Sequence, residues 1–194
     1  MPPPSPDSSS QAAQLADWMH RRPGSTLRAA KQALLVDTSL SPVEVFQHLE
    51  ILERQKDGPS VVQQRYFDAY ETALGAMEAL DEALLRPDVR LTGRLVQGHW
   101  NQSAEIRLRA HAAAEEVRAI LEDLAFDPRA ETMSTRVGPC TAWIDDQSPP
   151  MIRVICVPPP GRKLSHESLV AGGATVPLDL DDVRRRCLEH RRER

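Results

Sequence analysis

Hydrophobic side chains recur at helical spacing through the first third of the chain, with two clear interruptions. Pro23-Gly24 and residues 36–39 break the pattern, and residues 57–59 end it. Spacings of three and four place the apolar residues on one face of each segment. The inward positions are Leu15, Trp18, Met19, Leu27, Ala30, Leu34, Leu35, Val45, Leu49 and Leu52. The pattern predicts a three-helix module over residues 11–58, after a disordered Pro/Ser-rich tail at residues 1–10.

The third of these helices has the strongest start signal. Ser41 and Glu44 have the spacing of a capping box, and Pro42 occupies the first turn, where proline is tolerated. We therefore expect this helix to run from about residue 41 to residue 56.

The middle of the chain predicts two long helices, at residues 60–85 and 101–124, joined by a connector at residues 87–99. In the first, apolar residues follow a heptad-like seam that includes Val62, Ala73 and Met77. The pair predicts a long antiparallel helical hairpin over residues 59–127. Such a hairpin serves either as an intramolecular core or as a self-association or docking surface, and both readings stay open.

Beyond Asp127-Pro128 the pattern changes to alternation, which predicts strands at residues 132–137, 140–145 and 151–157. A turn centred on Ser148 would place Trp143 opposite Arg153, with a cation–π contact, and Cys140 opposite Cys156. A final helix over residues 180–194 is expected, with Asp179 as its cap.

These elements predict a mainly α protein of the α+β class. It has an N-terminal three-helix module, a long antiparallel helical hairpin and, over residues 128–194, a small antiparallel β region with a final helix.

The three-helix segment resembles bacterial transcription regulators of the helix-turn-helix type. The residues that carry the resemblance are Pro23, Gly24, Thr26, Leu27, Arg28, His48, Leu49 and Leu52. The resemblance implies that the third helix enters a DNA groove while nearby basic residues contact phosphates. The candidate DNA-binding residues are Arg21, Arg22, Arg28, Lys31, Gln47, His48 and Arg54. Gly58-Pro59 leads into another helix, so a plain form without a wing is expected, dimerising through residues 60–124.

Charge favours the competing interpretation. The net charge of -4 argues against a protein whose whole surface binds nucleic acid. Glu44, Glu50 and Glu53 make the third helix acidic, and acidic helices rarely face phosphate. The alternative is a non-enzymatic protein–protein interaction module, such as a secreted effector or chaperone. The arginine-rich final helix, with Arg184 and Arg191, is either a nucleic-acid contact or a solvated helix end.

No motif indicates catalysis, a cofactor or a metal site. Cys187 and His190 have metal-ligand spacing but form at most half a site, and His166-Glu167 has no assignable catalytic partner. No apolar run is long enough to span a membrane, and no signal peptide is recognisable. The three cysteines are widely spaced. We therefore expect a cytoplasmic bacterial protein that is not an enzyme.

Overall fold

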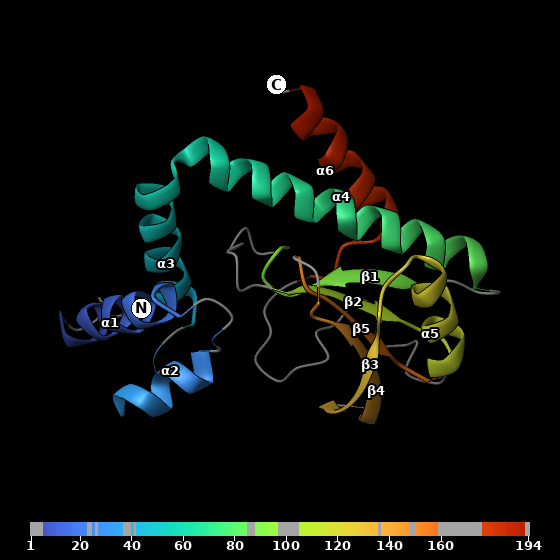
Figure 1. Cartoon of the computed structure of the whole chain (residues 1–194), viewed down its shortest axis with the longest axis horizontal. Helices are drawn as coiled ribbons and strands as arrows, with labels where there is room; N and C mark the ends of the chain where they lie inside the picture. The colour runs from blue at the N-terminus through green and yellow to red at the C-terminus, as the bar shows by residue number, and fades with distance from the viewer. Residues whose placement is uncertain are drawn as a thin grey trace. The chain divides into compact units, whose positions relative to one another are not determined.

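The computed structural model describes residues 6–22, 25, 27–36, 40, 42–84, 88–96, 105–135, 137–147, 150–158 and 176–192. Within them, helices and a five-stranded mixed sheet give an α+β fold (Figure 1). The chain divides into two compact units, with the change from the first to the second between Tyr66 and Phe67.

The first unit contains helices α1 (Pro6–His20), α2 (Leu27–Leu34) and α3 (Pro42–Asp57), together with the start of α4 (Pro59–Ala83). The three predicted helices are confirmed, but Leu34 and Leu35, which were predicted to face inward, are exposed. Helix α1 begins at Pro6, so residues 6–10 of the predicted disordered tail are helical. Proline is compatible with a first helical turn, so Pro6 does not prevent this earlier start. Ser41, of the predicted capping box, lies outside the described residues, whereas Pro42 is the first residue of α3 as expected.

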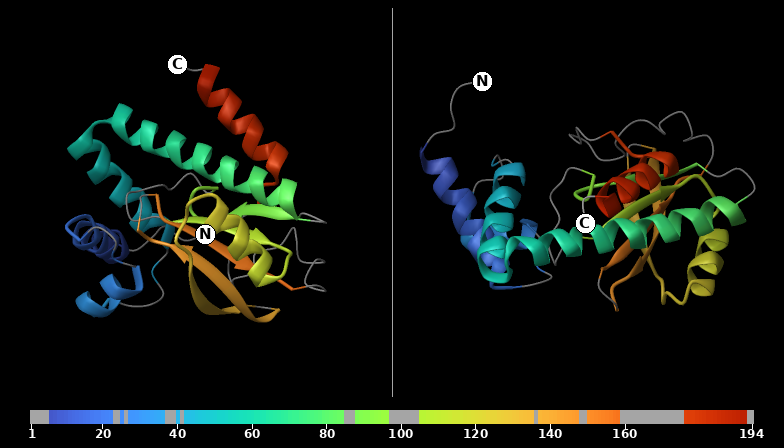
Figure 2. Two further views of the ribbon diagram at one scale, coloured as in Figure 1. Left: turned by 45° about the vertical axis from the view of Figure 1, so that its right-hand side comes forward. Right: turned by 90° about the horizontal axis from the view of Figure 1, so that it is seen from above.

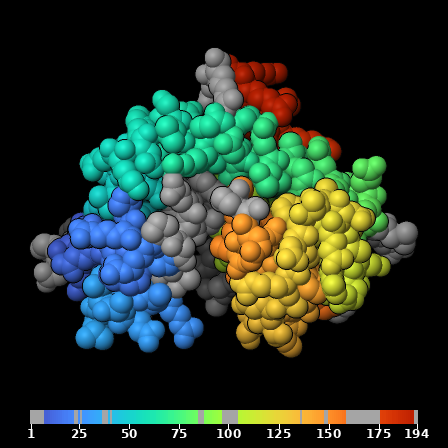
Figure 3. Space-filling view, in the orientation of Figure 1, coloured from blue at the N-terminus to red at the C-terminus, as the bar shows by residue number. Residues whose placement is uncertain are grey.

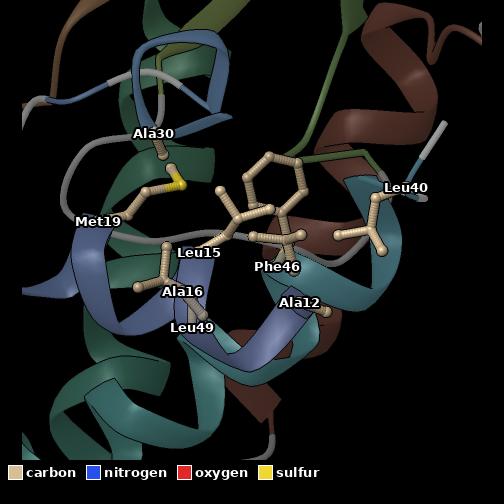
Figure 4. Close-up of a cluster of buried hydrophobic side chains, with 9 residues drawn as sticks. Ala12, Leu15, Ala16, Met19, Ala30, Leu40, Phe46 and Leu49 are labelled. Atoms are coloured by element: carbon tan, nitrogen blue, oxygen red, sulfur yellow. The ribbon is translucent and has the colours of Figure 1, made fainter. Parts of the chain in front are cut away.

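An apolar core joins the first three helices (Figure 4). Leu15 lies beside Phe46, and Met19 extends toward Ala30 in this cluster. Its buried members are Ala12, Leu15, Ala16, Met19, Ala30, Leu40, Val45, Phe46 and Leu49. Leucine and phenylalanine each contribute about 1.5–3 kcal/mol when fully buried, so this cluster is the main stabilising feature of the unit.

The second unit is built on the sheet, whose strand order is β1-β2-β5-β4-β3. The strands are β1 (Val89–Thr92), β2 (Ile106–Ala110), β3 (Arg129–Thr135), β4 (Gly138–Asp145) and β5 (Ile152–Cys156). All neighbours are antiparallel except β2 and β5, which are parallel. Helices α5 (Ala114–Asp123) and α6 (Leu180–Arg192) complete this unit with α4 from Phe67 onward (Figures 1 and 2).

The predicted helical hairpin is wrong, although its first helix is confirmed as α4. Residues 106–110 form strand β2 between β1 and β5, and α5 covers only the end of the predicted second helix. The segment fits both periods, because Ile106, Leu108 and Ala110 alternate while Ile106, Ala110 and Val117 have helical spacing. Pairing of β2 with β5 also joins the predicted domains 59–127 and 128–194 in one sheet.

The three predicted C-terminal strands are confirmed, but the predicted register is wrong by one residue. Trp143 lies opposite Val154, and Cys156 lies opposite Thr141 instead of Cys140. A slip of one residue moves every side chain to the other face of the sheet. Strand β5 is central and buried on both faces, so its apolar pattern could not fix the register.

Candidate nucleic-acid interface

Helix α3 presents an outward face that contains two of the predicted DNA-binding residues. Gln47 and Arg54 are exposed and are seven positions apart, so they lie almost in line along the helix. Val43 and Ile51 flank this line and are 43% and 51% exposed. We call these four residues the outward face of α3. The opposite side of the helix contributes Val45, Phe46 and Leu49 to the core.

Ion pairs between residues four apart engage two of the predicted DNA-binding arginines, Arg54 on α3 and Arg21 just after α1. Arg54 Nη2 lies 2.7 Å from Glu50 Oε1, and Arg21 Nη2 lies 3.0 Å from Asp17 Oδ2. Both pairs join residues four apart on exposed helix surfaces. Such pairs contribute only about 0.3–0.5 kcal/mol each, so a phosphate can displace the carboxylate at little energetic cost.

The other predicted contacts differ in their surroundings. Arg22 is exposed, and its guanidinium carbon lies 4.6 Å from the ring centroid of Trp18. Arg28 is exposed on α2. Lys31 is half-buried, and its Nζ donates to the Leu40 carbonyl oxygen at 3.0 Å, so it holds the chain between α2 and α3. His48 is half-buried on the side of α3.

The connection between α2 and α3 is longer than the three- or four-residue turn that is typical of a helix-turn-helix motif. It runs from residue 35 to residue 41. It begins with Leu35 at a φ of 51°, and the Val36 N–H donates to the Lys31 carbonyl oxygen at 3.1 Å. This bond is that of a Schellman helix end, in which glycine usually occupies the left-handed position.

Charge on the three-helix segment is balanced. Residues 11–58 contain six Lys and Arg side chains and six Asp and Glu side chains. A field that attracts nucleic acid can therefore come only from local clustering, and the exposed arginines of α2 and α3 are the groups available for it.

A second group of charged residues lies on the sheet, and the sequence patterns did not lead us to predict it. Arg90, Arg107, Arg109 and Arg153 all lie on one face, where Arg90 is opposite Arg109 and Arg107 is opposite Arg153. Each arginine stands between apolar residues of the other face, as in the segments VRLT, IRLRA and MIRVI. This alternation with a period of two was the signal that could have identified both β2 and its arginines.

Carboxylates offset these arginines. Glu105 bridges two of them, with its Oε2 2.8 Å from Arg153 Nε and its Oε1 bonded to Arg107. Burial acts to raise the pKa of Glu105, but Arg107 and Arg153 outweigh it, and the pKa lies below its usual value. Burial and the neighbouring Arg107 lower the pKa of Arg94 to about 10.

Two more carboxylates pair with Arg90. Arg90 Nε lies 2.9 Å from Asp88 Oδ1, and its Nη1 lies 3.2 Å from Asp179 Oδ2. Like charges on paired strands are destabilising without such partners, so we assign the group a structural role.

The arginines of α6 contact the rest of the second unit. Arg184 Nε donates to Glu78 Oε1 at 2.9 Å, and Arg191 Nε donates to Glu71 Oε1 at 3.0 Å, both on α4. Arg186 Nη1 donates to the Tyr70 hydroxyl at 2.8 Å. Arginines of α6 thus pair with glutamates of α4 at exposed positions. Asp179 accepts a bond from the Asp182 N–H at 2.9 Å, which confirms the predicted cap of α6.

Trp143, Cys187 and His190, which the sequence singled out for a cation–π contact or for metal binding, have packing contacts in the structure. Trp143 Nε1 donates to the Ala114 carbonyl oxygen at 2.7 Å, and Arg118, not Arg153, lies over its ring at 5.6 Å. Cys187 is buried, and burial raises the pKa of its thiol. The His190 ring packs against the rings of Phe67 and Tyr70.

Ser165, His166 and Glu167 lie outside the described residues. Among the residues that are described, no group of three or more His, Cys, Asp or Glu has a geometry that could hold a metal ion. Within the same residues, no helix combines the length and the apolar character needed to cross a membrane.

Comparison with known proteins adds no assignment. The chain matches no protein-family model, no curated protein and no solved structure.

Proposed function

We propose that this chain is a DNA-associated regulatory protein that contacts DNA through α3 and the N-terminal part of α2. The observation that carries the proposal is the outward face of α3, where Gln47 and Arg54 are exposed above a packed core. Arg28 is exposed on the neighbouring helix. Glutamine can bond to an adenine edge, and arginine can bond to guanine or phosphate.

The balanced charge of residues 11–58 sets the expected character of this binding. Each phosphate contact releases counterions, so affinity falls steeply with salt even when few contacts exist. With Arg28 and Arg54 as the main contacts, we expect weak binding at physiological salt and clear binding at low salt. The predicted self-association through a helical hairpin has no basis in this fold and is not part of the proposal.

A salt titration with the full chain tests the proposal. The probe is a fluorescent pool of random-sequence DNA duplexes long enough for two helical turns, and anisotropy is read at several salt concentrations. Removing two phosphate contacts in an Arg28→Ala, Arg54→Ala variant is expected to weaken binding and to reduce the slope of log K against log salt by about 2.

A matched variant controls for loss of positive charge alone. Arg118 and Arg129 are exposed arginines with carboxylate partners in the second unit. Arg118→Ala with Arg129→Ala is expected to leave the slope unchanged. If both double variants behave alike, or if the chain does not bind DNA at low salt, the proposal is wrong.

A second candidate function, binding of another protein, is favoured by the exposure of Val43 and Ile51. Two apolar side chains one helical turn to either side of Gln47 give α3 a surface that suits an apolar partner. In this case the partner lacks a strong charge, because the surrounding charges of the unit cancel.

Photo-crosslinking in the native cells separates the two functions. A benzophenone amino acid at position 47 is expected to give a discrete protein adduct that disappears with Ile51→Asp. The same amino acid at position 118 is the control. Absence of an Ile51-dependent adduct argues against the protein partner.

A further inference from the structure

The two outer strands of the sheet differ in how their free edges are treated. At the β1 edge, Leu91 and Leu178 form an antiparallel bridge, and each N–H donates to the other carbonyl oxygen at 2.9 Å. This contact covers the middle of a strand that is only four residues long. The β1 edge is therefore protected against pairing with another chain.

The β3 edge has no such protection. Within the described residues, β3 pairs only with β4, and its seven residues run without a bulge from Arg129 opposite Ile144 to Thr135 opposite Gly138. The strand contains no proline and no lysine, and its two charged residues, Arg129 and Glu131, lie in its first three positions. Its side chains are mostly exposed, and its atoms lie at the surface in Figure 3.

We propose that β3 is a self-association edge, on which β3 of a second copy of this chain pairs antiparallel around a two-fold axis at Thr132. The two sheets would then continue into one another. A two-fold axis at Thr132 pairs all seven residues of each strand, so no backbone group of β3 is left beyond the overlap. Identical patches facing each other are the usual form of a two-fold dimer.

The side chains of β3 suit this register. Thr132 would face Thr132, and Ala130 would face Ser134, so small uncharged residues meet on one side of the sheet. Cross-strand threonine pairs are favourable. On the other side Arg129 would face Thr135, so no like charges are directly opposite.

Charge complementarity favours a second copy as the occupant. In this register Glu131 of the second copy would lie opposite Met133. Arg153 Nη1 is already 3.6 Å from Met133 Sδ and 2.9 Å from Glu131 Oε2 of its own chain. Each guanidinium would therefore have a second carboxylate nearby, and the two-fold axis repeats the contact.

A pair of seven-residue strands buries less area than a standard stable interface. We therefore expect a weak dimer whose population depends on protein concentration. The inference is independent of DNA binding, because it uses only residues of the second unit.

Opposite charges placed at the axis test the proposal in the full chain. Thr132→Lys and Thr132→Glu each place like charges face to face in a dimer but are tolerated on the exposed edge of a monomer. Each is expected to raise the dissociation constant at least about fivefold, measured by sedimentation velocity over a concentration series. Thr132→Val, which keeps a β-branched side chain, is the matched control and is expected to dimerise.

Mixing the two charged variants provides the decisive measurement. An equimolar mixture places Lys opposite Glu and is expected to restore the wild-type sedimentation coefficient, which misfolded variants could not do. A wild-type chain that stays monomeric at every concentration overturns the proposal. So does a dimer that neither single variant weakens, or a mixture that stays dissociated.

Discussion

The two units of the chain use their charged side chains in different ways. In the first unit, pairs such as Arg54–Glu50 lie on exposed helix surfaces, and an apolar core supplies the stability. In the second, arginines project from the sheet itself and are held by half-buried carboxylates such as Glu105. A charge near solvent can exchange partners, whereas a charge inside a network is fixed in place. A site for a charged ligand is therefore expected on the helices of the first unit, and the arginines of the sheet are expected to be structural.

Loss of the Glu105 carboxylate is the largest effect that this comparison predicts. Glu105→Gln leaves Arg107 and Arg153 without their shared partner in a region with little solvent. We expect a loss of about 3 kcal/mol in the free energy of unfolding. Urea unfolding, followed by Trp143 fluorescence in a Trp18→Phe, Trp100→Phe background, measures it.

The matched control is Glu131→Gln, which also removes a carboxylate from Arg153 but at a position that is 47% exposed. We expect less than about 1 kcal/mol there. Equal losses of stability at both positions would show that burial does not determine how much each carboxylate contributes.

The cap of α6 predicts an intermediate effect that depends on pH. The bond from the Asp182 N–H, with help from Arg90, lowers the pKa of Asp179 below its usual value. Its contribution is therefore fully present above the unfolded pKa of about 3.9 and is lost as the pH falls through the folded pKa.

Asp179→Ala is expected to remove about 1 kcal/mol at neutral pH and to flatten the pH dependence between neutral and acid. Asp179→Asn, which keeps an acceptor for the cap, is expected to lose less at neutral pH. The measurement is urea unfolding at both pH values. An alanine variant with the wild-type pH profile would contradict the assignment.

Each unit contains a helix that ends in a Schellman motif with a non-glycine residue at positive φ. We therefore expect glycine at either position to increase the stability by a similar amount. Leu35 follows α2 and Ala125 follows α5, both at positive φ, and Phe126 N–H donates to the Leu121 carbonyl oxygen as Val36 N–H does to Lys31. Because Leu35 is 93% exposed, its replacement loses no buried contact. Leu35→Gly and Ala125→Gly are each expected to stabilise the chain by about 1 kcal/mol, measured as a rise in the thermal midpoint. Destabilisation by either glycine would contradict this expectation.

The smallest effect is expected for the exposed pair on α3. Glu50→Gln removes the partner of Arg54 and is expected to change stability by less than about 0.5 kcal/mol. The same variant is expected to strengthen DNA binding, because it removes a negative charge beside the outward face. A stability loss comparable to that of Glu105→Gln would remove the distinction between the two units.

The sequence predicted the helices of the first unit better than the sheet of the second. The helices of the first unit, helix α4 and the cap of α6 were recognisable because each has a helical apolar stripe or an end signal of its own. Strands β2 and β5 are central, so both of their faces are buried. Burial on both faces left two registers open for β5, whereas the apolar residues of β2 also have helical spacing with those that follow.

The candidate site was predictable only in part. The sequence identified the exposed residues Gln47, Arg28 and Arg54, since they fall outside the apolar stripes. It could not show that Lys31 is engaged by the Leu40 carbonyl oxygen, because that contact depends on the path of the chain between two helices. The sheet arginines depend on pairings that are distant in sequence, such as Arg107 with Arg153.

The parallel pairing of β2 with β5 has a consequence for the order of folding. Ile106 meets Ile152 only after α5, β3 and β4 have been synthesised, and the Leu91–Leu178 bridge forms later still. The core of the first unit joins α1 with α2 and α3, and all three helices are synthesised before the sheet begins. On the ribosome we therefore expect the helical unit to fold early, while the antiparallel pair of β1 and β2 waits for β5 and Leu178. A chain stalled between residues 111 and 151 would leave the β5-facing edge of β2 without a partner strand, which makes that interval of synthesis the one most dependent on chaperones.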